Sequence, residues 1–354
     1  MPNVISTNLR QKNISNLLNN INNESVYFVF SNPVAWGSGD NTPDIPYDSF
    51  SLISDVYNDM LYCKRALLTN STYVIRNYRW VSGSRYWQYD SRADYGTISS
   101  VYDDIILSIT LRPFYVVTDE YKVYKCIHNN YNGISTVKPT FTTTTTPTAL
   151  ADGYVWKYMF TIETPDIDKF FTSNWIPVKT LIADDTTAQW DVQAAAINGA
   201  IHNIIIDNAG AGYVSGATGI SFVGGKLGAT GITAVANATI SEDGEVTSVS
   251  ITNVGSEYIF EPTLSINGGT TNASLRAVLS PGVGHGSDPV SELASNSIMV
   301  KTRVSGSEGS VIIDRNDYRQ ISLLMNPAFS GSCYFVGATG SYPDTEIKLH
   351  DDHD

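Results

Sequence analysis

The chain has 354 residues, enough to bury a sizeable core and to form two or three domains of ~100–200 residues each. It carries 22 Lys and Arg residues against 35 Asp and Glu, and the resulting net charge of −13 disfavours nucleic acid or an anionic membrane as the main partner. No stretch approaches the ~20 apolar residues of a membrane span, and the N-terminus MPNVISTNLRQKN lacks the apolar segment of a signal peptide.

Helices are predicted at two places near the N-terminus. Apolar residues recur at helical spacing between Leu9 and Ile21, which predicts one short helix. After Asp48, a second apolar face with helical spacing runs from Ile53 to Leu67 and predicts a helix that packs on the core.

Most of the remaining first half is predicted to be β. Runs rich in β-branched and aromatic residues, bounded by turn residues, span Val26 to Phe30, Tyr73 to Val81, Ile105 to Leu111, Tyr121 to Ile127 and Tyr154 to Ile162. The last run belongs to the segment ADGYVWKYMF (Ala151 to Phe160), in which an Asp-Gly turn leads into large side chains and one charge, Lys157. This segment has no nucleophile with an adjacent base, so it indicates packing rather than chemistry. Thr136 to Leu150 contains a threonine tract and is predicted to be an exposed loop.

An internal repeat lies in the Gly-, Ala-, Ser- and Thr-rich part of the chain between Ala194 and Ser280. The first copy reads IIIDNAGAGY, ISFVGG and ITAVANATI, and the second reads VSITNVGSEY, LSINGG and ASLRAVL. Asn208, Gly210 and Tyr213 match Asn253, Gly255 and Tyr258 at one offset of 45 residues. Two similar β units packed together are expected, as in a small sandwich or barrel-like module. Such a module suits a structural spacer or decoration, and the alternative is a carbohydrate- or protein-binding module.

Histidine and cysteine offer little chemistry in this chain. The five histidines (His128, His202, His285, His350, His353) show no metal-binding spacing. His285 lies in the loop PGVGHGSDP, which could suggest a phosphate cradle but lacks the Lys and the following helix signal of a P-loop. A flexible Gly-rich connector with a hydrogen-bonded histidine is favoured. The terminal His350–His353 could ligate a metal, although a frayed polar terminus is favoured. Cys63, Cys126 and Cys333 are odd in number and far apart, which favours reduced thiols in a protein made in the cytoplasm.

The clustered carboxylates have no clear catalytic pattern. Asp40, Asp44 and Asp48 lie in a Pro-containing loop that lacks the glycine and terminal Glu of an EF-hand, and Asp103 and Asp104 precede a predicted strand. A glycosidase would need two such groups in one cleft, and turn or cap acids are favoured instead. We therefore predict that the protein is not an enzyme and has no catalytic, cofactor-binding or metal-ligating residue.

Aromatic residues interleaved with arginines run from Arg76 to Tyr89. This pattern could stack single-stranded bases, but the overall acidity argues against that function. The same residue types are enriched at protein–protein interfaces, so an interface or its supporting core is predicted. Trp80, Tyr86 and Trp87 are expected at or beneath an intersubunit contact.

Four segments resemble the baseplate wedge proteins of T-even-like contractile-tailed bacteriophages, of the type called gene product eight. In the family's order they are VYFVFSNPVAWGSGDNTPDIPYDS (Val26 to Ser49), YKVYKCI (Tyr121 to Ile127), DGYVWKYMF (Asp152 to Phe160) and DYRQISLLMNP (Asp317 to Pro327). The last two are the most specific, and the resemblance covers roughly half of the chain. Within the first segment, Trp36, Pro46 and Tyr47 are expected to anchor a loop. The repeat module has no counterpart in the best-known member, and the chain stops sooner after the fourth segment than the family commonly does.

The resemblance implies a mainly β, multidomain protein (α+β) with a few short helices and β-sandwich-like layers. It divides the chain into a wedge core with N-terminal helices (1–192), an inserted β module of two repeats (193–289, with copies at about 201–245 and 246–280), return strands that complete the core (290–330) and a C-terminal tail (331–354). It also implies a non-enzymatic subunit of the virion, assembled in the host cytoplasm. Such a subunit forms a homodimer, contacts other baseplate wedge subunits and takes part in baseplate rearrangement during infection. The alternative is a tail-associated carbohydrate-binding or adhesin-type protein.

Overall fold

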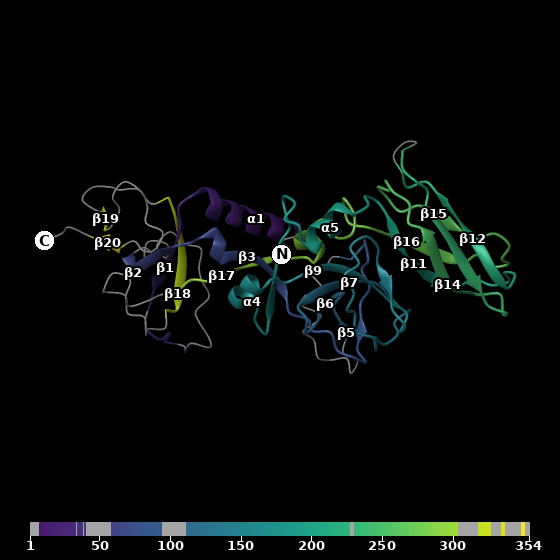
Figure 1. Cartoon of the computed structure of the whole chain (residues 1–354), viewed down its shortest axis with the longest axis horizontal. Helices are drawn as coiled ribbons and strands as arrows, with labels where there is room; N and C mark the ends of the chain where they lie inside the picture. The colour runs from purple at the N-terminus through teal and green to yellow at the C-terminus, as the bar shows by residue number, and fades with distance from the viewer. Residues whose placement is uncertain are drawn as a thin grey trace. The chain divides into compact units, whose positions relative to one another are not determined.

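The chain is mainly β and divides into two compact units in a computed structural model (Figure 1). The structure describes residues 7–32, 34–37, 39, 58–93, 111–226, 230–303, 318–326, 334–336 and 348–350. We call Val74–Asn296 the central unit, and Asn8–Tyr73 together with the residues from Ser297 onward the terminal unit. The predicted fold class, mainly β with a few short helices, is confirmed.

The terminal unit contains one long helix and several short strands. Its elements are α1 (Thr7–Asn23), β1 (Val26–Ser31), β2 (Met60–Arg65), the 3-10 helix η1 (Leu68–Asn70), β17 (Ser297–Val300), β18 (Gln320–Met325), β19 (Tyr334–Val336) and β20 (Lys348–His350). Strand β3 (Ser71–Arg76) crosses the boundary between the two units.

Strand β1 lies between β18 and β2 in an antiparallel sheet of the terminal unit. The first strand of the unit therefore pairs with a strand almost 300 residues later, with Val26 opposite Met325. Helix α1 is amphipathic, and its Leu18 and Ile21 are buried against Val26 and Ala66. The predicted N-terminal helix and first strand are thus confirmed.

The second predicted helix is wrong from Met60 onward, although Asn58 just before it is helical. Met60–Arg65 is strand β2, with Tyr62 opposite Phe30 of β1. Tyr62 and Cys63 are buried, whereas Leu61, the second residue of β2, is 54% exposed. The apolar residues in Met60–Arg65 form a strand because this segment pairs with β1, and the local spacing of the residues does not reveal that partner. Residues 51–57 of this prediction lie outside the described part of the chain.

In its described residues, the central unit contains a small sheet, the helices α4, α5 and α6, and the repeat module. The elements outside the module are β4 (Arg85–Tyr86), β5 (Leu111–Arg112), β6 (Tyr115–Val117), β7 (Lys122–Asn129), β8 (Thr148–Ala149), β9 (Tyr154–Thr161), α4 (Thr164–Phe170), β10 (Trp175–Val178), α5 (Ala188–Ala194) and α6 (Pro289–Glu292). Those of the module are β11 (Ile201–Asn208), β12 (Gly216–Val223), β13 (Val235–Ile240), β14 (Val246–Asn253), β15 (Thr263–Ser265) and β16 (Ser274–Leu279).

Strands β6, β7, β9 and β8 form the core sheet of the central unit, in that order. Its long strands β7 and β9 are the predicted runs Tyr121–Ile127 and Tyr154–Ile162, so both predictions are confirmed. One face of the pair is aromatic: Tyr124 lies opposite Tyr158, and Cys126 lies opposite Trp156. All four side chains are buried, which explains why a segment with so many large residues behaves as a packing strand.

The Asp-Gly turn before β9 is held by the side chain of Asp152. Its Oδ2 accepts hydrogen bonds from the backbone N–H groups of Thr136 (2.8 Å) and Val137 (3.0 Å), and its Oδ1 accepts one from Tyr154 N–H (3.2 Å). Asp152 is therefore a turn acid. The preceding segment, Thr136–Leu150, is irregular except for β8, as predicted for a loop, but only about half of its residues are exposed.

The two sequence repeats interlock in one six-stranded sheet, the repeat module (Figure 1). Each copy supplies three strands: β11, β12 and β13 from the first, and β14, β15 and β16 from the second. The first strand of each copy pairs with the third strand of the other, β11 with β16 and β14 with β13, while β12 pairs with β15 at the centre. The core of the module is built from both copies together.

The matched residues of the repeat make matched contacts. Asn208 accepts a hydrogen bond from Gly210 N–H (2.8 Å), and Asn253 accepts one from Gly255 N–H (2.9 Å). Both glycines have a positive φ, 64° and 67°, which explains their recurrence at this turn. The Tyr213 hydroxyl accepts from the N–H of Ala273 (2.6 Å), and the Tyr258 hydroxyl accepts from that of Ala234 (3.0 Å). Each tyrosine thus reaches the third-strand region of the other copy.

None of the helices in the described part of the chain combines the length and the apolar character that a membrane crossing needs. Cys63 and Cys126 are buried free thiols, as predicted, and Cys333 lies outside the described residues. The predicted strand from Ile105 likewise falls largely outside them.

Candidate functional site

Two lysines are buried side by side in the core sheet, on the opposite face from the aromatic pairs. Lys125 of β7 lies directly opposite Lys157 of β9, and their exposed fractions are 0% and 1%. Like charges at opposed positions of a sheet are unfavourable, and buried charges need partners. Each ammonium group therefore has its own set of acceptors.

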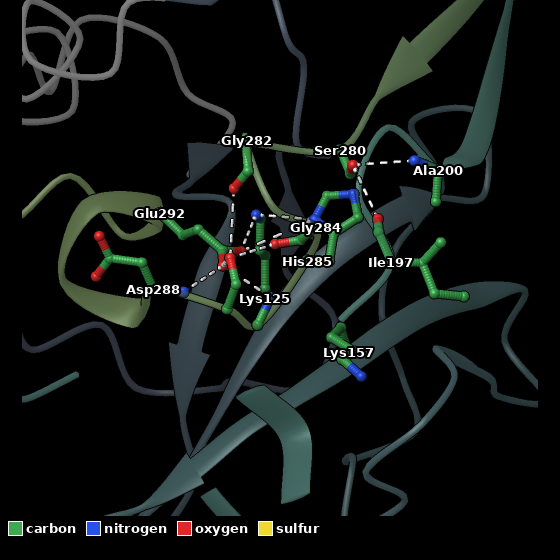
Figure 2. A network of polar contacts seen from close by, with 12 residues as sticks. Lys125, Lys157, Ile197, Ala200, Ser280, Gly282, Gly284, His285, Asp288 and Glu292 are labelled. Atoms are coloured by element: carbon green, nitrogen blue, oxygen red, sulfur yellow. Dashed lines mark hydrogen bonds and ion pairs between the residues drawn. The ribbon is translucent and has the colours of Figure 1, made fainter. Parts of the chain in front are cut away.

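Lys125 is paired with residues that are distant in the sequence. Its Nζ lies 2.8 Å from Oε2 of Glu292 and 2.9 Å from Nδ1 of His285, and 3.9 Å from the centre of the Tyr89 ring. Figure 2 shows these charged groups pointing toward one another. Burial lowers the pKa of Lys125, and the adjacent Glu292 carboxylate opposes that shift.

The carboxylate of Glu292 also fixes the connector, Pro281–Asp288, which runs from the repeat module to α6. Its Oε1 accepts hydrogen bonds from the backbone N–H groups of Gly286 (2.7 Å) and Asp288 (3.1 Å). These are the amides that a phosphate cradle would have used, and the chain's own carboxylate already occupies them. The predicted hydrogen-bonded histidine is confirmed, since His285 is buried and bonded to Lys125, whereas the predicted flexibility of the connector stays a prediction.

Lys157 turns away from this pair. Its Nζ donates hydrogen bonds to the carbonyl oxygens of Thr144 (2.6 Å) and Thr145 (3.1 Å), and Figure 2 shows it directed away from Glu292. Burial lowers the pKa of Lys157 to about 8, because its ammonium group has no directly bonded carboxylate that would offset the loss of hydration. Lys157 thus ties the threonine-rich loop to the core sheet.

Two histidines complete this cluster, which we call the buried network (Lys125, Lys157, His202, His285 and Glu292). The rings of His202 and His285 meet edge to face with their centres 5.3 Å apart. Burial lowers the pKa of His202 to about 4, and it lowers that of His285 well below its usual value, helped by Lys125. Both rings are therefore neutral at physiological pH.

The buried network fastens segments together and is shielded from solutes. Lys125, His285 and Glu292 are buried, so a substrate cannot reach their polar atoms in this conformation. Beside them, the start and the end of the repeat module close on each other: Ala200 N–H donates to Oγ of Ser280 (3.1 Å), and Ser280 N–H donates to the carbonyl of Ala200 (2.9 Å). This arrangement holds the root of the module against the core sheet (Figure 2).

The residues predicted at an interface fall into distinct environments. Tyr86 is 1% exposed and packs against Tyr154 and Trp156 in the core, whereas Trp87 is 45% exposed. Trp80 is half-buried, packs on the same core and donates its Nε1–H to Oγ of Ser135 (3.1 Å). The structure thus places Tyr86 and Trp80 in the core and leaves the neighbouring Trp87 exposed.

The remaining predicted residues are only partly covered by the structure. Trp36 is half-buried in the terminal unit. Pro46 and Tyr47 lie outside the described residues, as do Asp40, Asp44, Asp48, Asp103 and Asp104. Within the described residues, no group of three or more His, Cys, Asp or Glu side chains could hold a metal ion. His353 lies outside that part of the chain.

Sequence reasoning missed the buried network as a unit. Lys125 and Glu292 are separated by 167 residues, and neither belongs to a recognisable motif. The available signal was a lysine inside each of two strands rich in large apolar side chains: Lys125 in YKVYKCI, which also has Lys122 at its start, and Lys157 in YVWKYMF. A lone charge in a buried strand requires a partner, although the sequence alone does not identify it.

Comparison with known proteins adds no assignment: no protein-family model matches the sequence, and no curated protein matches it significantly.

Proposed function

We propose that this chain is a structural subunit of the baseplate wedge of a contractile phage tail, located in the virion and assembled in the host cytoplasm. The observation that carries the proposal is how the four family-like segments pair. The first, at Val26, forms β1 and pairs with β18 in the fourth segment; the second forms β7 and pairs with β9 in the third. Segments that a resemblance groups together would be expected to form common cores, and these do.

The chemistry of the described sites also suits a scaffold. The most concentrated set of charged and titratable groups, the buried network, is enclosed and directed at the chain's own backbone, as a structural fastening requires. The exposed Trp87 above an aromatic core provides the kind of anchor that protein interfaces favour. We propose that the subunit acts without enzymatic activity, forms a homodimer and holds neighbouring wedge subunits together while the baseplate rearranges.

The oligomeric state and the partners of the purified chain test this function. Light scattering should give the mass of a dimer, and co-expression with neighbouring baseplate subunits of the same phage should yield a co-purifying complex. A monomer at all accessible concentrations that captures none of these subunits would contradict the proposal.

A pair of variants then tests the predicted anchors. W36A and W87A should each weaken dimerisation or wedge assembly if these indoles lie at contacts, whereas F260A, an exposed aromatic of the repeat module, serves as the comparison. Unchanged assembly of W87A would remove Trp87 from the interface without affecting the test of the dimer itself.

A further inference from the structure

An open cleft of about 380 Å³ lies within the central unit. It is bounded by the segment Trp87–Asp90, by the end of β7 with its turn (His128–Asn132), and by Ile204–Ile206 of β11. Its volume is within the range of small-molecule sites, ~300–1,000 Å³. The cleft is separate from the enclosed polar groups of Lys125 and Glu292.

Two half-exposed aromatic rings line this cleft from different segments. Trp87 is 45% exposed and Tyr131 is 46% exposed, although both follow strands whose neighbouring side chains are buried. A flat apolar ring that stays accessible inside a concave site offers a stacking surface to a ligand with an apolar face.

Apart from the carboxylate of Asp90, the polar side chains that line the cleft are neutral, and they include both donors and an acceptor. Asn203 donates its Nδ2–H to the carbonyl of Ile127 (2.9 Å), so its Oδ1, 3.1 Å from Nδ1 of His128, is the acceptor of that contact. The proton therefore sits on Nδ1 of His128, and Nε2 is left as an acceptor. Burial lowers the pKa of His128, which keeps the ring neutral.

Two side-chain amides in the cleft retain donors. Asn132 uses its Oδ1 and its backbone N–H in bonds with Asn129, and Gln88 uses its Oε1 to accept from Asn129 N–H. In the described part of the chain, the amide NH₂ groups of Asn132 and Gln88 have no hydrogen-bond partner. Both groups line the cleft.

The charges near the cleft are matched within the chain. Arg276 binds Asp90 with two hydrogen bonds of 2.9 and 2.7 Å, so that carboxylate and guanidinium neutralise each other. Among the described residues, no Lys or Arg lines the cleft itself. A phosphorylated or carboxylated ligand would find no counter-charge there, which selects a neutral ligand.

The turn that presents Tyr131 is held in a strained conformation. Asn130, Tyr131 and Asn132 have consecutive positive φ angles of 49°, 52° and 65°. Asparagine tolerates this left-handed conformation, whereas a residue such as Tyr131 adopts it at a cost of ~1–3 kcal/mol. Asn129 fixes the turn through its paired bonds with Asn132. Strain of this kind persists where the position of a side chain matters.

We propose that this cleft binds a neutral saccharide of one or two pyranose rings. The C–H face of a sugar ring stacks on Trp87, with Tyr131 beside it, and its hydroxyl groups bond to the amides of Gln88 and Asn132 and to Nε2 of His128. The chemistry is that of alternating apolar faces and neutral hydroxyl groups, which this set of side chains matches. This binding goes beyond the wedge function and does not depend on it.

Ligand-observed saturation-transfer NMR with the full-length chain tests the proposal. The probes are methyl glucoside, methyl galactoside, N-acetylglucosamine and maltose at millimolar concentration, with glucose 6-phosphate and sialic acid as anionic comparisons. At least one neutral sugar should bind saturably and more tightly than the anionic ones. Binding of the anionic sugars alone, or of none of the six, would overturn the proposal.

Variants locate the binding. W87A and N132A should each weaken it at least about tenfold, W87F should retain part of it because the stacking surface remains, and F260A should leave it unchanged. Equal sugar binding by W87A and the wild-type chain would exclude this cleft. Thermal unfolding of each variant shows whether it is still folded. If W87A does not fold, the sugar binding of N132A and Q88A decides whether the cleft is the site. Loss of dimerisation in W87A without sugar binding by the wild-type chain would instead assign Trp87 to the interface.

Discussion

At the scale of single residues, the buried network is the feature with the largest expected energetic consequence. Lys125 and Glu292 form an ion pair whose side chains are 0% and 1% exposed. A buried pair of this kind adds little net stability over apolar residues of the same shape, but removing one partner leaves an uncompensated charge. The network therefore makes its members mutually dependent.

Replacing Glu292 by Gln should lower the free energy of unfolding by ~3–5 kcal/mol, because Lys125 loses its counter-charge inside the core. Urea unfolding followed by tyrosine and tryptophan fluorescence measures the change. D119N is the matched control: Asp119 and Lys138 also lie 2.8 Å apart, but Asp119 is 72% exposed, so its loss should cost far less than the loss of Glu292. A loss from E292Q no larger than that from D119N would contradict this account. The double variant K125M/E292Q should recover much of the loss, because it removes the orphaned charge and keeps a side-chain oxygen as acceptor for the N–H groups of Gly286 and Asp288.

The histidines of the network predict sensitivity to acid. The pKa of His202 is lowered to about 4 from an ordinary value of 6.5, so between these pH values the unfolded chain binds a proton that the folded chain does not. The stability that comes from keeping His202 neutral in the folded chain is fully present above pH 6.5 and is lost as the pH falls toward 4. Unfolding free energies of the wild-type chain and H202Q, measured across this range, should differ in slope by up to ~1.4 kcal/mol per pH unit, with H202Q the flatter. Parallel profiles would contradict the prediction.

At the scale of elements, the interlocked repeats explain why the same residues recur. Tyr213 and Tyr258 each bond to a backbone N–H that the other copy contributes, and each matched Asn-Gly turn positions its tyrosine. The hydroxyl groups thus complete the sheet at two equivalent places. The two hydroxyl groups should contribute similar amounts to the free energy of unfolding, because their surroundings are similar.

Y213F and Y258F should each lower the free energy of unfolding by ~1–3 kcal/mol, because each leaves an N–H group without its acceptor. Y258F should have the larger effect, since the bond from Ala234 is buried and the one from Ala273 is only partly so. Chemical denaturation of the two single variants and the double variant gives the comparison. A change in one variant without any change in the other would contradict the equivalence of the two copies.

Local pattern was sufficient for some elements and insufficient for others. The strands β7 and β9 and the helix α1 were predictable because their residue types favour those structures independently of their partners. Met60–Arg65 was misassigned because its strand depends on β1, and the pairing of β1 with β18 was not predicted. The repeat was evident at an offset of 45 residues, but the exchange of strands between copies is a long-range choice that the sequence does not display. The same holds for the sugar cleft, whose walls come from three distant segments.

At the scale of the whole molecule, the repeat module is inserted into the central unit with its two chain ends side by side at the root, and it also contacts that unit through Arg276–Asp90 and Asn203–His128. The chain enters at Ala200 and leaves at Ser280, and these two residues are hydrogen-bonded to each other. After Ser280, the connector leads the chain from the root of the module back to α6 of the central unit. A segment whose ends meet in this way can be removed without pulling its neighbours apart.

Replacing Ile201–Leu279 with a short Gly-Ser linker should leave the core sheet folded and the oligomeric state unchanged. Hydrogen exchange should still show protection of β7 and β9, and light scattering should give the oligomer of the complete chain. The loss of Arg276 and Asn203 removes contacts with Asp90 and His128, so a modest drop in the unfolding temperature is expected. Unprotected amides in β7 and β9 would show instead that the module is needed for the sheet to fold.

The exchange of strands within the repeat module has a consequence for how it could have arisen. Neither copy can close its own sheet, because its first strand finds its hydrogen-bonding neighbour only in the other copy. The single covalent link between the copies is the tight hairpin Ser241–Glu245 joining β13 to β14. Cut there, the module would be a two-fold dimer of identical topology, so the present chain preserves in one polypeptide what duplication and fusion of a self-associating ancestor would produce.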